Sequence, residues 1–203
     1  MALALLVALA LAPAAQARTL RVVALGDSLT AGYGLPPGQA FPDALQRALK
    51  AKGFDVAVAN AGVSGDTAAG GLARFDWSVP EGTDALIVEL GANDMLRGAD
   101  PSQTEKTLAQ ILEKARGLHI PTLLAGMRAA PNLGPDYQRQ FDAIYPDLAK
   151  RYGVTLYPFF LAGIAGDPKL NQPDGLHPTR EGVDRIVTTM LPTVEGFLGK
   201  ITP

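Results

Sequence analysis

The stretch Val22–Gly34 reads VVALGDSLTAGYG, and it decides how the rest of the chain is interpreted. Together with Leu20 and Arg21, its apolar first half predicts a buried strand over residues 20–26 that stops at Gly26. A carboxylate and a hydroxyl follow at once, at Asp27 and Ser28. Ser28 could cap a helix, help to bind a phosphate, or attack a substrate, and the stretch alone does not decide among these roles.

The rest of the chain alternates short apolar segments with segments of helical periodicity. Strands are predicted over residues 54–62, 82–91, 120–126 and 154–160. Helices are predicted over residues 40–53, 101–117, 135–153 (with a kink or break at Pro146) and 179–199. This alternation predicts the α/β class: one three-layer α/β/α sandwich domain with a five-stranded parallel sheet.

Composition excludes several kinds of protein. The 203 residues are 47% hydrophobic and 19% charged, as expected of a globular domain, and the formal net charge is −2. No run of basic residues predicts a nucleic-acid partner or a polybasic membrane patch. The chain has no cysteine, which excludes disulfides, thiolate metal sites and a cysteine nucleophile.

Residues 1–17, MALALLVALALAPAAQA, are uncharged and end in an Ala-x-Ala pattern. This pattern predicts a signal peptide that is cleaved to leave the domain 18–203, in the periplasm or secreted, with no stable membrane anchor. The segment lacks the basic residues that usually begin a signal peptide, so a short membrane anchor or a hydrophobic first helix remains an alternative.

Polar, glycine-bearing turns follow the predicted strands. They are Gly26–Leu29 after the first strand, 60–67 after the second, 91–94 after the third, and 174–178 before the last helix. Because the carboxyl ends of parallel strands share one edge, we expect these turns to meet there. His119 lies at the start of a strand, at the other edge, and is expected to be a surface or strand-entry residue.

The D-x-x-H spacing of Asp174 and His177 lets the carboxylate accept the Nδ1 proton and leaves Nε2 free as a base. The same spacing also fits a simple Asx turn. Around Ser28, no lysine follows Gly32 and neither G-x-G-x-x-G nor G-x-S-x-G is present, which excludes a phosphate-binding loop and a hydrolase elbow of the G-x-S-x-G type.

A helix cap or a nucleophile therefore remains for Ser28. A nucleophile requires a base, a residue that orients the base, and donors for an oxyanion. His177 and Asp174 supply the first two. The backbone N–H groups of Ser28 and Gly65 and the side-chain amide of Asn93 are candidates for the third. Gly32 and Gly34 are expected to keep the entrance to Ser28 open.

Four blocks occur in order: GDSLTAGYG, NAGVSGDT, ELGANDMLRG and DGLHP. From Leu20 to the last helix the chain resembles the SGNH hydrolases, or GDSL esterase/lipase family, and its bacterial multifunctional acyl-CoA thioesterase/lysophospholipase/arylesterase branch. The resemblance implies a flavodoxin-like SGNH fold and the catalytic residues Ser28, Asp174 and His177. It also implies an oxyanion hole made by Ser28, Gly65 and Asn93.

The resemblance further implies a serine esterase for carboxylic esters and thioesters, including aryl and fatty-acyl esters, acyl-CoA or lysophospholipid. We expect a monomer that acts on a small molecule and needs no cofactor or metal. Asp27 and Asp94 are interpreted as acceptors that organise loops. Ala92 stands where many relatives have glycine and is expected to affect only its loop.

The loops after the third and fourth strands carry apolar residues that fit an acyl chain, although they also fit ordinary packing. These residues are Met95, Leu96, Met127, Pro131 and Leu133. Two alternatives remain for the function: a carbohydrate O-acetylesterase, or a binding module for acyl or glycan ligands without catalysis.

Overall fold

The computed structural model describes residues 18–201, and the predicted signal peptide at 1–17 lies outside them. Within this range one parallel sheet has the strand order β2-β1-β3-β4-β5. Its strands are β1 (Leu20–Gly26), β2 (Val56–Gly62), β3 (Ala85–Glu89), β4 (Thr122–Ala125) and β5 (Thr155–Tyr157). The predicted α/β fold is confirmed, and four of the strands are shorter than the apolar segments that predicted them.

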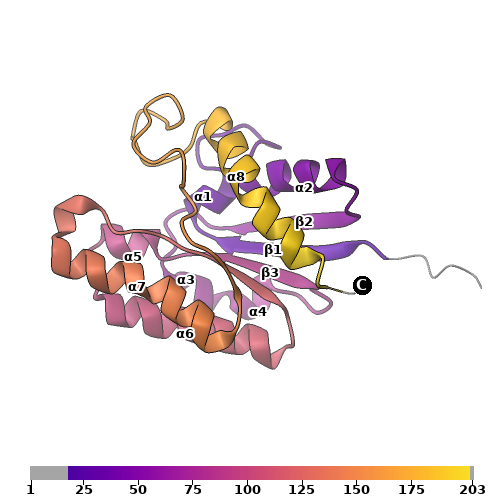
Figure 1. The fold of residues 1–203 in the computed structure, drawn as a ribbon, viewed down its shortest axis with the longest axis horizontal. Coiled ribbons are helices and arrows are strands. Elements are labelled where there is room, and N and C mark those ends of the chain that lie inside the picture. Colours follow the sequence, from indigo (N-terminus) through magenta and orange to yellow (C-terminus); the bar gives the residue numbers. More distant parts are fainter. Residues whose placement is uncertain (1–17, 202–203) are drawn as a thin grey trace, which may run out of the picture.

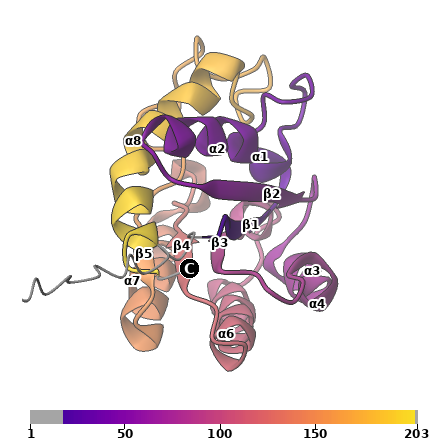
Figure 2. The ribbon, with the colours of Figure 1, turned by 90° about the vertical axis from the view of Figure 1, so that its right-hand side faces the viewer.

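The helices form the two outer layers of the sandwich. They are α1 (Ser28–Ala31), α2 (Phe41–Ala51), α3 (Ala68–Ala73), α4 (Phe75–Ser78), α5 (Ala92–Leu96), α6 (Pro101–Gly117), α7 (Pro135–Tyr152) and α8 (Arg180–Leu198), with a 3-10 turn η1 (Pro131–Leu133). Figure 2 shows α2 and α8 on one face of the sheet and α3, α4, α6 and α7 on the other. No helix among residues 18–201 is long and apolar enough to cross a membrane.

Helix α7 does not break at Pro146, so of the predicted kink or break the break is excluded. The helix runs from Pro135 to Tyr152 with the proline inside it. Proline removes one backbone donor. The buried face of the helix, which includes Phe141, Ile144 and Leu148, continues on both sides of the proline and holds the helix against the sheet.

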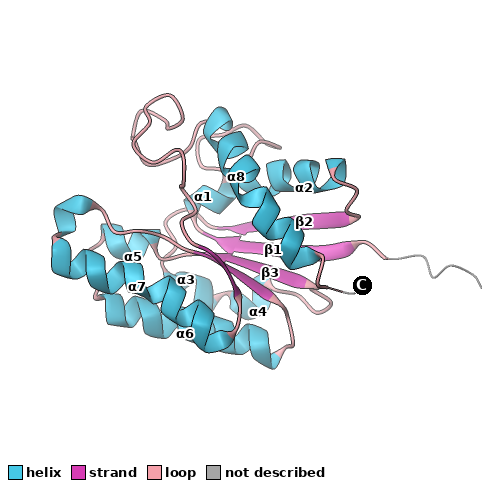
Figure 3. Cartoon of the chain, in the orientation of Figure 1, coloured by secondary structure: helices cyan, strands magenta, loops and turns pink. Residues whose placement is uncertain are grey.

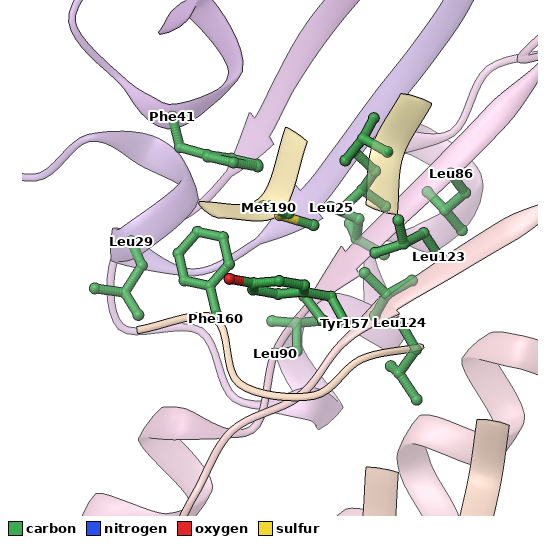
Figure 4. Close-up of a cluster of buried hydrophobic side chains, with 14 of the residues drawn as sticks. Leu25, Leu29, Phe41, Leu86, Leu90, Leu123, Leu124, Tyr157, Phe160 and Met190 are labelled. Atoms are coloured by element: carbon green, nitrogen blue, oxygen red, sulfur yellow. The ribbon is translucent and has the colours of Figure 1, made fainter. Parts of the chain in front are cut away.

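The core between the sheet and helices α2 and α8 is built from large apolar side chains. Figure 4 shows Leu25 of β1, Leu86 of β3 and Met190 of α8 in one cluster of buried side chains. The rings of Phe41 and Phe160 meet edge to face, with their centroids 4.9 Å apart. Burying each such side chain contributes about 1.5–3 kcal/mol, so this layer holds the strand ends in place.

The register of the sheet brings three turns together at one edge. Gly26, the last residue of β1, pairs with Gly62 of β2 and with Glu89 of β3. Figures 1 and 3 show α1, α5 and the long loop between β5 and α8 at this end of the molecule. His119 precedes β4 and lies at the opposite edge, exposed, as expected.

Candidate active site

Ser28, His177 and Asp174 lie in one hydrogen-bonded row at the carboxyl edge of the sheet. The Ser28 hydroxyl lies 2.8 Å from Nε2 of His177. The Nδ1 atom of His177 lies 2.7 Å from Oδ2 of Asp174. With the imidazole proton on Nδ1, Asp174 accepts it and Nε2 faces the hydroxyl as a base.

The loop itself fixes the Asp174 carboxylate. Its Oδ1 atom accepts the backbone N–H groups of Leu176 and His177 at 2.9 and 3.0 Å. The backbone N–H of His177, the His177 ring and the N–H of Leu176 lower the pKa of Asp174 to about 2. Asp174 therefore stays an anion, and its orientation toward the imidazole is set by the peptide groups of its own turn.

Asp27, not Ser28, caps helix α1. The Oδ1 atom of Asp27 accepts the backbone N–H of Leu29 at 3.0 Å, which places Ser28 at the first helical position. The Ser28 hydroxyl faces His177 instead of a backbone amide. The alternative in which the Ser28 side chain is a helix cap is therefore wrong, because the neighbouring carboxylate takes that role.

The expected oxyanion donors surround Ser28, but they differ in availability. Within residues 18–201, the backbone N–H groups of Ser28 and Gly65 are left without a protein acceptor. Gly65 has a φ of +85°, and this left-handed backbone is the reason that the structure shows for glycine here. Arg97 holds the adjacent carbonyl of Gly65 at 2.8 Å.

The Asn93 amide already has two partners. Its Nδ2 atom donates to the carbonyl of Asp66 at 2.9 Å and to Oδ2 of Asp27 at 3.1 Å. An NH₂ group has two protons, so both are engaged. An oxyanion would have to share or replace one of these bonds.

The carboxylates next to the triad organise the loops, as the sequence predicts. Asp27 contacts Leu29 and Asn93, and Asp94 accepts the N–H of Ala68 at 2.8 Å at the start of α3. Burial raises the pKa of Asp27 to about 6, against the opposing effect of its bonds from Leu29 and Asn93. Ala92 begins α5 and leaves the Asn93 amide in place at the site.

Several residues that support the site had no signal in the sequence. The ring of Tyr33 lies 4.5 Å from the His177 ring, centroid to centroid. Gln172 donates its amide to the carbonyls of Tyr33 and Pro178 at 2.7 and 3.0 Å, which joins the loop after α1 to the loop that carries His177. The spacing that predicts a catalytic triad does not predict such hydrogen bonds between two loops.

Arg74 is a second such residue. It donates to the carboxylate of Asp66 at 2.6 Å and to the carbonyls of Ala61 and Gly26 at 2.8 Å each. These bonds connect the ends of β1 and β2 with the loop that presents Gly65 and receives the Asn93 amide. The guanidinium has five N–H donors, which is why one side chain can serve all three acceptors.

The structure gives backbone reasons for glycine at Gly32 and Gly34, and the expectation that they keep the entrance to Ser28 open stays a prediction. Both have a positive φ, +82° and +73°, and Gly32 is the C-cap of α1. A Cβ at Gly32 would lie 2.6 Å from Cβ of Ala40, and one at Gly34 would meet the Gln172 amide. They allow α1 to end and the chain to pass close to its neighbours.

A cavity of about 340 Å³ opens beside Ser28 and His177. Of the residues expected to line an acyl groove, Met95, Leu96, Met127 and Pro131 do so. Leu133 does not line it and packs against the hydrophobic core. The sequence placed Leu133 in the right loop, but an aperiodic loop does not show on which side each side chain lies.

Other residues of this cavity were not expected, among them Phe159, Leu161, Leu176 and Arg128. Phe159 and Leu161 belong to the loop after β5, whereas the sequence analysis placed Phe159 in the fifth strand and gave Leu161 no role. A larger hollow of about 520 Å³ lies at the amino ends of β4 and β5 and includes His119. It contains no member of the triad, so we assign the substrate site to the smaller cavity.

Comparisons with known proteins identify the family of this chain. Residues 24–185 match the GDSL-like Lipase/Acylhydrolase family. Esterase TesA of Pseudomonas aeruginosa is 42% identical over 185 residues, covering 91% of each chain. Thioesterase 1/protease 1/lysophospholipase L1 of Escherichia coli K12 is 43% identical over 83% of this chain and 79% of that protein.

A solved structure is also similar over most of its length. The crystal structure of AlinE4, an SGNH-hydrolase family esterase, has a TM-score of 0.76 with 45% sequence identity. The match covers 90% of this chain and 98% of the other. Since the identity is high and the coverage nearly complete, the likeness extends beyond the fold to the family.

Proposed function

Because the chain belongs to the GDSL-like lipase/acylhydrolase family, we propose that it is a serine esterase that hydrolyses carboxylic esters and thioesters through an acyl-enzyme. The observation that carries this proposal is the row Ser28–His177–Asp174, with both hydrogen bonds at 2.7–2.8 Å. The names of the relatives, an esterase and a thioesterase/lysophospholipase, support the hydrolysis of both ester and thioester bonds.

The first half of the reaction acylates Ser28. Its Oγ atom attacks the carbonyl carbon of the ester while Nε2 of His177, at 2.8 Å, takes the hydroxyl proton. Asp174 stabilises the imidazolium that forms, and it can do so throughout the working pH range because its pKa is about 2. His177 then gives the proton to the departing alcohol or thiol as the carbonyl bond re-forms.

The second half returns the free enzyme. His177 removes a proton from a water molecule, whose oxygen attacks the acyl carbon, and Ser28 leaves with the proton that His177 gives back. A tetrahedral oxyanion arises in both halves. The backbone N–H groups of Ser28 and Gly65 can donate to it, and Asn93 can do so by sharing its longer bond to Asp27.

The apolar cavity supports an acyl chain as the group held beside Ser28. Met95 and Met127 are buried in it, while Leu96 is half exposed at its side. Its volume of about 340 Å³ lies near the lower end of the usual range for small-molecule sites. We therefore expect short and medium acyl chains to fit best, on aryl, glycerophosphate or thiol leaving groups.

Hydrolysis rates test this proposal directly. The purified protein is assayed with p-nitrophenyl esters from acetyl to palmitoyl and with acyl-CoA, alongside Ser28→Ala. We expect turnover by the native chain alone, with the highest kcat/KM at short or medium length. Activity on acetyl esters alone would instead identify an O-acetylesterase. No turnover of any ester would leave only a binding module.

We also propose that residues 1–17 direct export, so that the mature enzyme acts in the periplasm or outside the cell. The support is the uncharged apolar segment and its Ala15-Gln16-Ala17 end. Expression of the full chain in a bacterium, with fractionation and N-terminal sequencing, tests this. We expect an exported product that begins at Arg18, and an uncut cytoplasmic product would contradict the proposal.

A further inference from the structure

Glu89 lies directly beneath the turn that carries Ser28. It is the last residue of β3, pairs in register with Gly26, and is 1% exposed. Its Oε2 atom accepts the hydroxyl of Thr30 in α1 at 2.7 Å. Its Oε1 atom is buried and has no donor among the described protein groups. A buried carboxylate oxygen without a donor is costly, and a proton on that oxygen would remove the cost.

The neighbour of Glu89 is the carboxyl group of Asp27. Burial, first, and the charge of Asp27, second, raise the pKa of Glu89 well above its ordinary value. A hydrogen bond from Glu89 is among the interactions that lower the pKa of Asp27, against the larger effect of burial. Asp27 directly follows Gly26, the register partner of Glu89, and both carboxyl groups are buried. Two neighbouring buried carboxyl groups cannot both be anions at low cost, which favours one shared proton.

The groups around the pair leave this proton with Glu89. Asp27 accepts hydrogen bonds from the backbone N–H of Leu29 and the amide of Asn93, whereas Oε1 of Glu89 has no donor among the described protein groups. The Tyr145 hydroxyl donates to the carbonyl of Leu90 at 3.0 Å and is therefore not a donor for Glu89. Asp27 thus has the better hydrogen-bond partners of the two buried carboxyl groups and is the anion of the pair.

We propose that Glu89 is a positioning residue that carries a proton on Oε1 and donates it to the carboxylate of Asp27. The inference rests on the proposed esterase function for its catalytic meaning, since it acts through Asp27 on Ser28 and Asn93. With Glu89 as a donor, Asp27 stays an anion that caps α1 and restrains the Asn93 amide. When Asn93 turns an N–H toward an oxyanion, the carboxylate of Asp27 still accepts the hydrogen bond from Glu89.

The same contact explains the glycine before Asp27. A Cβ at Gly26 would lie 2.7 Å from Oε2 of Glu89 and 2.0 Å from the Thr30 hydroxyl oxygen. Its φ is not positive, so backbone conformation is not the reason for glycine here. Glycine at this position makes room for the Thr30–Glu89 pair under the nucleophile turn.

A carboxyl-carbon NMR spectrum measures the proton directly. The full chain is labelled with ¹³C at the glutamate side-chain carboxyl, and Glu89→Gln identifies the Glu89 resonance by its loss. We expect this resonance at the position of a carboxylic acid at pH 7. Titration of Glu89 together with the exposed glutamates would overturn the proposal, whether or not the protein is an esterase.

Kinetics then test the positioning role. Glu89→Gln keeps a neutral donor of the same shape, so we expect kcat within about threefold of the native value. Glu89→Leu has no donor, and we expect kcat to fall by about 10- to 100-fold with KM changed less than threefold. Glu81→Gln is the matched control. A Glu89→Gln enzyme that loses activity as Glu89→Leu does, or a fully active Glu89→Leu, would contradict the role.

Two controls keep the outcomes separate. Circular dichroism shows whether each variant is folded, and if Glu89→Leu is not, the NMR measurement and Glu89→Gln still decide. Labelling of Ser28 by a fluorophosphonate reports the proposed function independently. An unlabelled native protein would refute the esterase, and a labelled one with an ionised Glu89 would refute only the shared proton.

Discussion

Nε2 of His177 lies 2.8 Å from the hydroxyl oxygen of Ser28, although 149 positions separate the two residues in the chain. Ser28 begins α1, directly after β1, and His177 lies in the turn before α8, so strands β2 to β5 lie between them in sequence. The distance is that of a normal hydrogen bond. Catalysis therefore depends on how rigidly two distant loops are held together.

Replacing Asp174 with asparagine removes the anion that orients the imidazole. Asn can no longer accept the Nδ1 proton with a full charge, so His177 is held in a less productive tautomer. We expect kcat to fall by roughly 10²- to 10⁴-fold with little change in KM. Steady-state kinetics on p-nitrophenyl butyrate check this, and an Asp167→Asn variant is a control in the same loop. Unchanged kcat would remove Asp174 from the triad.

Replacing Asn93 with alanine removes one oxyanion donor. A single donor is worth roughly 10²- to 10³-fold in kcat, because its bond strengthens only in the transition state. We expect that loss with KM nearly constant. Burst titration counts the active sites, so a smaller active fraction cannot imitate the effect. A rise in KM at constant kcat would assign Asn93 to substrate binding instead.

Filling the cavity changes the preferred acyl length. Ala130 lines the cavity beside Ser28, whereas Ala162 lies outside it. We expect Ala130→Phe to lower kcat/KM for decanoyl esters by at least about tenfold, and that for acetyl esters by less than threefold, because only the long chain needs the filled space. Ala162→Phe is the matched control. Equal losses on both esters would place the acyl chain elsewhere.

Activity falls at acid pH. The carboxylate of Asp27 holds the Asn93 amide at 3.1 Å, and with a pKa of about 6 it becomes neutral below pH 6. Asp174 stays ionised in this range because its pKa is about 2. We expect kcat/KM to fall as pH drops below 6, because the neutral Asp27 restrains the oxyanion donor less well. A flat profile there would contradict the role of the Asp27 carboxylate.

Stability depends on pH through Glu89. Its pKa in the folded state is raised well above 4.5, so above that pH the unfolded chain releases a proton that the folded chain keeps. The free energy of unfolding is therefore greatest below pH 4.5. Above pH 4.5 it falls by up to about 1.4 kcal/mol per pH unit, until the pH passes the pKa of Glu89 in the folded state.

Glu89→Gln removes this slope. We expect the variant to be more stable than the native protein at pH 7–8 and to show a flatter dependence on pH. Urea unfolding between pH 6 and 9 measures it, and this range lies above the window in which Asp27 contributes an effect of the same sign. Parallel curves for the two proteins would show that Glu89 is already ionised in the fold.

Sequence reasoning predicted the fold because its signals were long and periodic. Helix α6 was predicted at its observed bounds, Pro101–Gly117, since proline, basic residues and glycine mark its ends. The short helices α1, α3, α4 and α5 have four to six residues and show no periodicity to detect. The predicted break at Pro146 does not occur, because the packing of α7 outweighs one lost hydrogen bond.

The reacting residues could be predicted because their chemistry demands particular residue types at the strand ends. The residues that hold them in place could not be predicted. In the sequence, Glu89 lies near the end of an apolar strand. Only the pairing of β3 with β1 shows that it lies beside Gly26. Tyr33 and Gln172 hold the His177 loop through bonds across 139 positions, which no local spacing encodes.

The central claim is that the Ser28 hydroxyl is the attacking group. The direct measurement is to incubate the full chain with a fluorophosphonate and to locate the adduct by peptide mass spectrometry, with Ser28→Ala and Ser64→Ala treated in parallel. The account predicts one adduct, on Ser28, formed by the native protein and by Ser64→Ala and absent from Ser28→Ala. An adduct on another residue, or a folded native protein that forms none, would contradict it.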